Sequence, residues 1–199
     1  MLFRSFELLE REVDSILQSK DFVGPSQELV LRRAVDATVT ELEPNLWEDE
    51  LERLLDFGHT FSPSLEMNSD LLHGEAVAID MVLSAIIAYR RGLMDRSAVA
   101  RLLALLTRAG LPTSHKLCIA DFLWAALNET TKHRDGMQRC PLPVGIGRAV
   151  FVNDLSYGEL EAACLELRTL LYAVVTEWAS DDRRTAGTHG ASYDRPSRS

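Results

Sequence analysis

Apolar residues recur at helical spacing along most of the chain, which predicts a mainly helical core. Gly-Pro, Pro-Asn and Gly-Leu-Pro sequences interrupt the pattern and separate the predicted helices. These helices cover residues 2–17, 26–41, 47–55, 60–67, 74–91, 95–109, 119–128 and 154–178. The first helix begins in mid-pattern with no capping residue, so we expect the sequence to start inside a longer fold.

Residues 137–152 depart from the helical pattern. Two short apolar stretches flank a Val-Gly-Ile-Gly sequence there, which predicts a β-hairpin or an extended loop. The Gly-x-Gly does not make a dinucleotide-binding loop, because that loop needs a third glycine, a preceding strand and a following helix. We therefore predict a mainly α fold in one domain, residues 1–178. The Arg, Ser, Gly and Thr-rich remainder, 179–199, is predicted to be a disordered tail.

Composition and charge narrow the classes of partner. The 199 residues are 46% hydrophobic and 26% charged, which is typical of one soluble globular domain. A net charge of −9 disfavours binding to nucleic acid or to an anionic membrane. The N-terminal segment is too charged for a signal peptide, and no stretch is apolar enough to span a bilayer. With three widely spaced cysteines and no CxxC, we expect a cytoplasmic protein with free thiols.

The candidate chemistry lies in residues 56–82, where His59 and His73 each adjoin a glycine. Imidazoles brought together at helix ends are suitable ligands for zinc or cobalt, whereas isolated core histidines usually bond a backbone group. Their spacing of fourteen residues matches neither a zinc finger nor HExxH, so two different elements would have to supply them. We expect Glu66 to be structural, and Asp80 to be a buried hydrogen-bonding group on an apolar helix.

Two motifs here carry a family resemblance. Gly58-His59-Thr60 followed by His-Gly-Glu-Ala-Val at 73–77 resembles the paired metal-binding motif of the dehydroquinate synthase-like sugar phosphate cyclases. The helical C-terminal domain of that family is similar to residues 1–178, with Ala-Gly-Leu-Pro at 109–112 and Pro-Val-Gly-Ile-Gly at 143–147 in the expected order. The resemblance implies Zn²⁺ or Co²⁺ on His59 and His73. It also implies NAD, bound mainly by an N-terminal domain that this sequence lacks.

Departures from dehydroquinate synthase indicate a subfamily. The chain has Glu52 where that enzyme has an arginine, Thr38 where it has a lysine and Pro63 where it has a histidine. The arginine and lysine hold a substrate carboxylate there, and Glu52 would repel that anion. The chain instead resembles the 2-epi-5-epi-valiolone synthases, which close sedoheptulose 7-phosphate, at Asp56, Phe61-Ser62-Pro63, Ile79-Asp80-Met81 and His133-Arg134-Asp135-Gly136.

The same resemblance implies a reaction and its substrate contacts. NAD⁺ would take a hydride from the sugar phosphate, phosphate would leave, hydride would return and an intramolecular aldol step would close the ring. Glu52 and Asp56 suit recognition of hydroxyl groups. Lys132 and His133 lie near the position where the family has basic residues at its phosphate end, although a solvated basic loop is the alternative reading.

Two histidines are fewer than the three protein ligands of a typical catalytic zinc ion. In the family, a glutamate that precedes the helical domain is the third. Three hypotheses follow: a truncated or split cyclase completed by an N-terminal domain on another chain, a non-catalytic remnant or binding module, and a dehydroquinate synthase fragment, which Glu52 and Pro63 disfavour. We expect no cyclase activity from the isolated chain. Its first helix, with an exposed apolar face, is predicted to cause self-association, for instance as a homodimer.

Overall fold

The computed structural model describes residues 2–18, 24–47 and 49–170. Within these ranges the fold is mainly helical, as the sequence predicts. The α-helices are α1 (Leu2–Gln18), α2 (Pro25–Leu42), α3 (Ser62–Met67), α4 (His73–Arg90), α5 (Arg96–Arg108) and α6 (Ala120–Lys132), and the short 3₁₀ helices are η1 (Glu43–Asn45) and η2 (Leu54–Asp56). A further helix follows, whose described part is 157–170.

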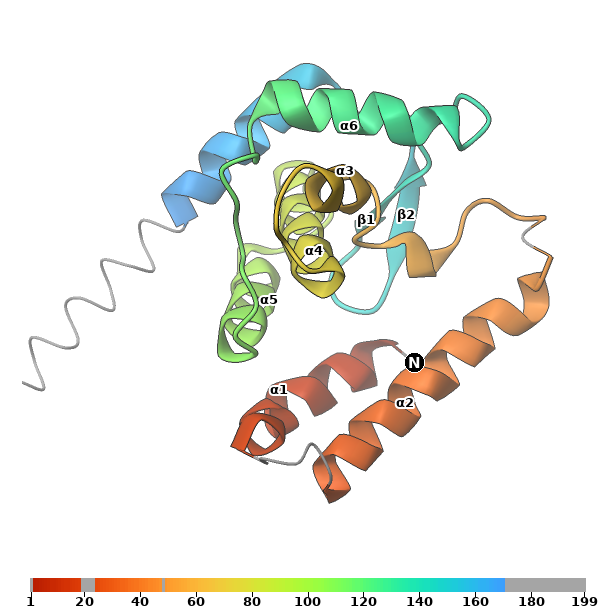
Figure 1. The fold of residues 1–199 in the computed structure, drawn as a ribbon, viewed down its shortest axis with the longest axis vertical. Helices are drawn as coiled ribbons and strands as arrows, with labels where there is room; N and C mark the ends of the chain where they lie inside the picture. Colours follow the sequence, from red (N-terminus) through yellow and green to blue (C-terminus); the bar gives the residue numbers. More distant parts are fainter. Residues whose placement is uncertain (1, 19–23, 48, 171–199) are drawn as a thin grey trace, which may run out of the picture.

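The core is built around α4, which lies at the centre of the domain between α3, α5 and α6 (Figure 1). Apolar residues occupy almost every face of α4, and eleven of its residues are buried. A helix that is apolar all round must be covered by other elements. Leu123 and Leu127 of α6, with Leu160 and Leu167 of the helix at 157–170, complete this core. The buried part of α4 begins at Ala76, and His73 is the first residue of the helix.

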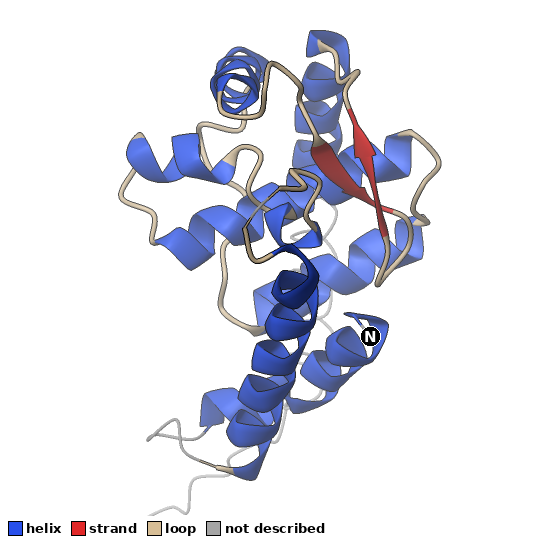
Figure 2. Cartoon of the chain, turned by 90° about the vertical axis from the view of Figure 1, so that its right-hand side faces the viewer, coloured by secondary structure: helices blue, strands red, loops and turns tan. Residues whose placement is uncertain are grey.

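The predicted hairpin is present. Strands β1 (Cys140–Pro143) and β2 (Ala149–Val152) pair antiparallel, with Cys140 opposite Val152 and Pro143 opposite Ala149 (Figure 2). Gly145 and Gly147 lie in the connecting turn with φ of 62° and 94°, a left-handed conformation that glycine adopts without steric cost. The Gly-x-Gly is thus a hairpin turn. Strand β1 is buried against α4 along its whole length.

Helices α1 and α2 lie side by side at one end of the molecule (Figures 1 and 2). Ion pairs from Glu10 to Arg101 and from Asp14 to Arg108 hold α1 on α5. Leu8 and Val13 of α1 are buried at 7% and 5% exposure, so the apolar face that we expected to be exposed is covered in part. Leu17, near the end of the helix, stays 50% exposed.

Helix α2 carries a row of exposed apolar residues. None of its residues is buried, and Leu31, Val35 and Val39 recur at four-residue spacing with more than half of each side chain exposed. This spacing puts them on one side of the helix. Within the described ranges, no helix is both long and apolar enough to cross a membrane.

The predicted helix at 47–55 is wrong for residues 49–53, which are irregular, and Leu54 and Leu55 are helical only as part of η2. The Asn45 side chain accepts a hydrogen bond from the Glu50 backbone N–H (3.0 Å) and donates one to the Glu50 carbonyl (2.7 Å). A side chain that satisfies the backbone in this way competes with helix formation. Helix α6 runs four residues past its predicted end at 128 and stops before Asp135 and Gly136, both at positive φ. The rest of the predicted last helix and the predicted tail lie outside the described residues.

An ion pair at the C-terminus of α4 should make the stability depend on pH. Arg91 Nε contacts Glu159 Oε1 at 2.6 Å, and its guanidinium lowers the pKa of Glu159 to about 2. Because this lies below the unfolded value, the stabilisation is complete above about pH 4.5 and is lost as the pH falls toward 2. Solvent screens the pair, whose side chains are 20% and 35% exposed, so we expect a contribution of about 1 kcal/mol.

Urea unfolding at pH 6 and pH 3 checks this prediction. Wild type should lose about 1 kcal/mol more than Glu159→Gln between the two pH values. Glu161→Gln, at an exposed position on the same helix, should behave as wild type. The same pH dependence in wild type and Glu159→Gln would show that the pair contributes nothing.

Candidate functional site

The structure brings His59 and His73 together. Their ring centroids are 5.5 Å apart, with an angle of 48° between the ring planes. His59 lies three residues before α3, and His73 begins α4, so two different elements supply the rings, as their spacing in the sequence requires. His59 is half-buried and His73 is exposed.

Each histidine has an oxygen acceptor at Nδ1. His73 Nδ1 lies 3.0 Å from Glu66 Oε2, and His59 Nδ1 lies 3.4 Å from the Phe57 carbonyl oxygen. A carboxylate or carbonyl oxygen accepts a hydrogen bond from Nδ1–H, and a neutral ring that donates in this way has its lone pair on Nε2. A histidine oriented by a carboxylate or carbonyl at one nitrogen is typical of metal sites. The two contacts therefore favour the tautomer that a metal ion requires.

Glu66, which we expected to be structural, does not lie on a helix that includes His59. A continuous helix would put it two turns after His59, but α3 begins only at Ser62. Glu66 instead reaches the next helix and orients His73. Glu75 also has a local role, since its carboxylate accepts a hydrogen bond from the Leu72 backbone N–H (2.9 Å) at the start of α4.

The backbone around His59 is held by two residues from the C-terminal end of α6 and the loop after it. Arg134 Nη2 donates to the His59 carbonyl at 3.4 Å, and Thr130 Oγ1 donates to the Thr60 carbonyl at 2.8 Å. The same guanidinium donates to the Gln138 and Arg139 carbonyls at 3.1 and 2.9 Å. Arg134 thus joins its own loop to the segment that carries His59.

A third anchor comes from α4. Asp80 Oδ2 accepts hydrogen bonds from the backbone N–H groups of Phe61 (2.5 Å) and Ser62 (2.8 Å), and Ser84 Oγ donates to Oδ1 (3.2 Å). Asp80 is fully buried, as the sequence analysis expected of a hydrogen-bonding group. Burial raises the pKa of the Asp80 carboxyl, and the hydrogen bonds oppose that rise.

Gly58 allows the chain to turn tightly against α4 just before His59. Its φ is +85°, and a Cβ atom at this position would lie 2.9 Å from both Met81 Cγ and Val77 Cγ1. Real Cβ atoms essentially never approach other heavy atoms so closely. Only glycine fits here without moving α4 or the His59 segment.

Asp56 lies beneath this segment in a buried charge cluster. Its Oδ1 contacts Arg53 at 3.0 Å, and its Oδ2 contacts Arg134 at 3.3 Å. Only 11% of the side chain is exposed. Glu52, the other acidic residue predicted to contact substrate, is exposed and lies in the irregular stretch before η2.

Lys132 and His133 lie at the end of α6, next to the Arg134 contact with the His59 segment. Their side chains are 68% and 79% exposed. Lys132 Nζ pairs with Glu129 at 2.5 Å, and His133 Nε2 lies 4.0 Å from the same carboxylate. The next residue, Arg134, joins the loop that follows these two side chains to the His59 segment.

The described part of the chain holds no group of three His, Cys, Asp or Glu side chains that would bind a metal ion. All three cysteines are free and buried. Burial raises the pKa of Cys140 to about 12 and that of Cys164 to about 11, so neither thiol is ionised near neutral pH. The two imidazoles suit zinc or cobalt in ligand chemistry and tautomer, and a complete site needs a third ligand from elsewhere.

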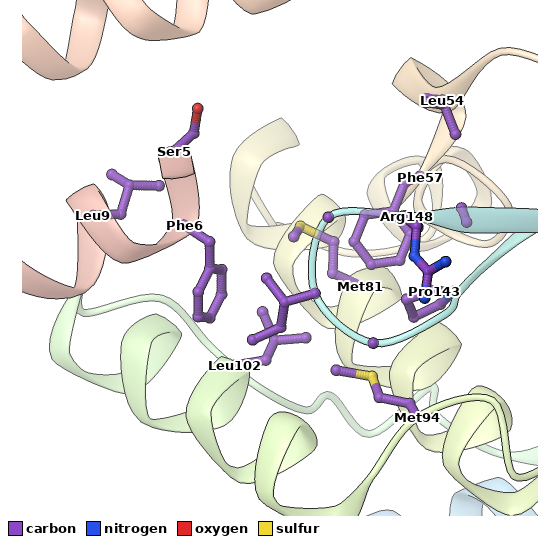
Figure 3. Close-up of a pocket in the computed structure, with 14 residues that line it drawn as sticks. Ser5, Phe6, Leu9, Leu54, Phe57, Met81, Met94, Leu102, Pro143 and Arg148 are labelled. Atoms are coloured by element: carbon purple, nitrogen blue, oxygen red, sulfur yellow. The ribbon is translucent and has the colours of Figure 1, made fainter. Parts of the chain in front are cut away.

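An apolar pocket of about 260 Å³ is lined by α1, α4, α5 and the hairpin turn (Figure 3). Phe6 and Leu9 of α1 form one wall, opposite Phe57 and Met81, and the hairpin turn contributes Arg148 (Figure 3). Apolar side chains provide almost no hydrogen-bonding partners for a polyol. The pocket therefore does not suit the hydroxyl groups of a sugar phosphate.

A family model described as "3-dehydroquinate synthase C-terminal" matches residues 3–133. A 2-epi-5-epi-valiolone synthase from Streptomyces hygroscopicus subsp. jinggangensis (strain 5008) is 49% identical over 169 residues, covering 81% of this chain and 41% of that protein. A demethyl-4-deoxygadusol synthase from Trichormus variabilis is 40% identical over 174 residues, covering 83% and 42%. The chain thus spans about two fifths of the length of these relatives.

A solved structure supports the same similarity. The 2-epi-5-epi-valiolone synthase of Streptomyces hygroscopicus subsp. jinggangensis 5008, with NAD⁺ and Zn²⁺ bound, matches 83% of this chain with a TM-score of 0.80 and 49% sequence identity. The match covers 46% of that chain. The helical arrangement described above therefore corresponds to one part of that longer protein.

Proposed function

Because the chain belongs to the sugar phosphate cyclase family that shares the 3-dehydroquinate synthase C-terminal domain, we propose that it is the metal- and substrate-binding part of a cyclase acting on sedoheptulose 7-phosphate. The observation that carries this proposal is the His59 and His73 pair, with a centroid distance of 5.5 Å and both Nδ1 atoms already hydrogen-bonded. The product proposed is the cyclitol 2-epi-5-epi-valiolone, with phosphate released.

In this proposal His59 and His73 hold Zn²⁺ or Co²⁺ through Nε2, and Glu66 keeps His73 oriented. When bound, the metal supplies a Lewis acid that polarises a substrate oxygen. The third ligand and most of the NAD site belong to the N-terminal domain, on the same or a separate chain. The relatives' greater length supports this division, because the chain covers only 41–46% of them.

Charge supports a substrate without a carboxylate. Glu52 is exposed and lies four residues before Asp56, and its carboxylate would repel a substrate carboxylate but accept hydrogen bonds from hydroxyl groups. The buried Asp56 contributes a second carboxylate. Arg53 and Arg134 balance its charge, and it is less accessible to substrate than the exposed groups. Lys132 and His133, the exposed basic groups of the α6 end, are the proposed phosphate contacts.

Reconstitution tests the proposed function. The purified chain, a separately expressed N-terminal domain from a relative, NAD⁺, Co²⁺ and sedoheptulose 7-phosphate are mixed, and released phosphate is measured. We expect release from the complete mixture and none from the chain alone. His59→Ala should abolish release, whereas His115→Ala, in the loop between α5 and α6, should not.

The outcomes separate the hypotheses. No release from the complete mixture, while an intact homologue works alongside, would count against a cyclase and favour a non-catalytic binding module of the same fold. This second candidate is favoured by the ligand set, because two histidines are fewer than the three protein ligands of a typical catalytic zinc ion. Release only from a carboxylated heptulosonate phosphate would instead identify a dehydroquinate synthase.

A further inference from the structure

We infer that Asp80 is a positioning residue, which sets the distance between His59 and His73 and thereby the metal affinity of the pair. The inference rests on the proposed metal-binding function. It goes further by assigning a role to a buried carboxylate that touches neither imidazole.

Asp80 is on the same helix as one histidine and binds the segment of the other. It lies seven residues after His73 on α4, which puts both residues on one side of the helix, two turns apart. Its Oδ2 accepts the backbone N–H groups of Phe61 and Ser62, two and three residues after His59. One side chain thus joins the two ligand-bearing elements directly.

The same contact fixes α3. Phe61 is the N-cap of α3 and Ser62 its first residue, so their N–H groups have no acceptor within that helix. Asp80 provides the acceptor from outside. Since α3 also carries Glu66, which bonds His73 Nδ1, the connections close a ring: α4 to α3 through Asp80, and α3 back to α4 through Glu66.

The other anchors of the His59 segment do not make this connection. Arg134 and Thr130 bind the carbonyls of His59 and Thr60 from the α6 side of the segment. Neither residue is on the helix that carries His73. Loss of Asp80 would therefore leave the segment attached to α6, but without its hydrogen bonds to α4.

The burial of Asp80 makes its removal costly at this place. Its side chain is fully buried, so no solvent can replace it as acceptor for the two N–H groups. An asparagine is the same shape and keeps a carbonyl oxygen that accepts both N–H groups, while Ser84 Oγ can turn to accept from the new amide. A leucine fills similar space but accepts nothing.

Three variants test the role. Asp80→Asn should keep Co²⁺ affinity within about 3-fold of wild type, whereas Asp80→Leu should weaken it at least about 10-fold, the size typical of outer-shell changes. Leu83→Ala is the matched control, because it opens a cavity at a fully buried site on the same helix without touching the hydrogen bonds of Asp80. It should lower the melting temperature yet leave Co²⁺ affinity unchanged.

A second measurement needs no metal. Nuclear Overhauser effects between the ring protons of His59 and His73 in the metal-free full chain should be present in wild type, Asp80→Asn and Leu83→Ala, and absent in Asp80→Leu. If Asp80→Leu keeps both the ring contacts and wild-type Co²⁺ affinity, the positioning role is wrong. If Leu83→Ala weakens Co²⁺ binding as much as Asp80→Leu does, general destabilisation explains the effect and the role is again wrong.

The two measurements also separate this inference from the function on which it rests. Wild type with clear ring contacts but no Co²⁺ binding would overturn the metal site, while the loss of those contacts in Asp80→Leu would still support positioning by Asp80.

Discussion

Replacing Gly58 with alanine is expected to lower the free energy of unfolding by about 3 kcal/mol and to displace His59. Two costs add up here. A φ of +85° strains any residue with a Cβ atom, and the new methyl group would meet Met81 and Val77 of α4 at 2.9 Å. Relief of that clash must move the backbone next to His59, so Co²⁺ affinity should fall with stability.

Gly110→Ala is the matched control for this prediction. Gly110 also has a positive φ, of 73°, but a Cβ atom there meets nothing within 4 Å. Its substitution should cost about 1 kcal/mol of backbone strain and leave metal binding unchanged. The melting temperature should therefore fall by about 6–12 °C for Gly58→Ala and by about 2–4 °C for Gly110→Ala. Equal shifts in the two variants would mean that the contacts with α4 do not constrain the turn.

His59→Ala and His73→Ala are each expected to weaken Co²⁺ binding by at least about 100-fold, because loss of a direct ligand should exceed the 10–100-fold effect of outer-shell changes. The two rings are close enough to share one ion, and a single imidazole on the surface has no second ligand to hold it. His115→Ala should bind as wild type, because His115 lies in the loop between α5 and α6.

Isothermal titration with Co²⁺ measures these affinities directly, and thermal unfolding provides an independent check. Metal at about 100 times the wild-type dissociation constant should stabilise wild type by about 2.7 kcal/mol and each alanine variant by about 0.4 kcal/mol or less. Wild-type affinity in His59→Ala would exclude the pair as the site, and the bound ion would have to be located elsewhere.

Helices could be predicted where the pattern of apolar residues within the segment is enough to determine the secondary structure. Residues 74–91 are apolar on every face and flanked by glycines, so local sequence indicates a buried helix, and α4 is its outcome. Residues 47–55 have a similar apolar spacing, yet two hydrogen bonds between Asn45 and Glu50 take the backbone out of helical geometry. A single side chain that competes for backbone groups leaves no trace in hydrophobic periodicity.

Both histidines of the candidate site could be singled out from the sequence, but the contacts that support them could not. The glycines beside His59 and His73 indicated these two residues, and the resemblance to the cyclases indicated Asp56. The contacts from Thr130 and Arg134 come from residues far along the chain and reach backbone carbonyls, so no spacing rule indicates them. A hydroxyl near a helix end and an arginine in a basic loop have many other roles, and only the tertiary fold selects this one.

The hydrogen bonds of Asp80 make it possible to measure how often the His59 segment opens. The N–H groups of Phe61 and Ser62 lie at the junction of an irregular segment and a short helix, where amide protons normally exchange fast with solvent. Both point to a fully buried acceptor, so they should exchange only when the His59 segment separates from α4. Their exchange rates give the free energy of that opening. The order of the histidine segment can thus be followed through two protons, before any metal, cofactor or substrate is added.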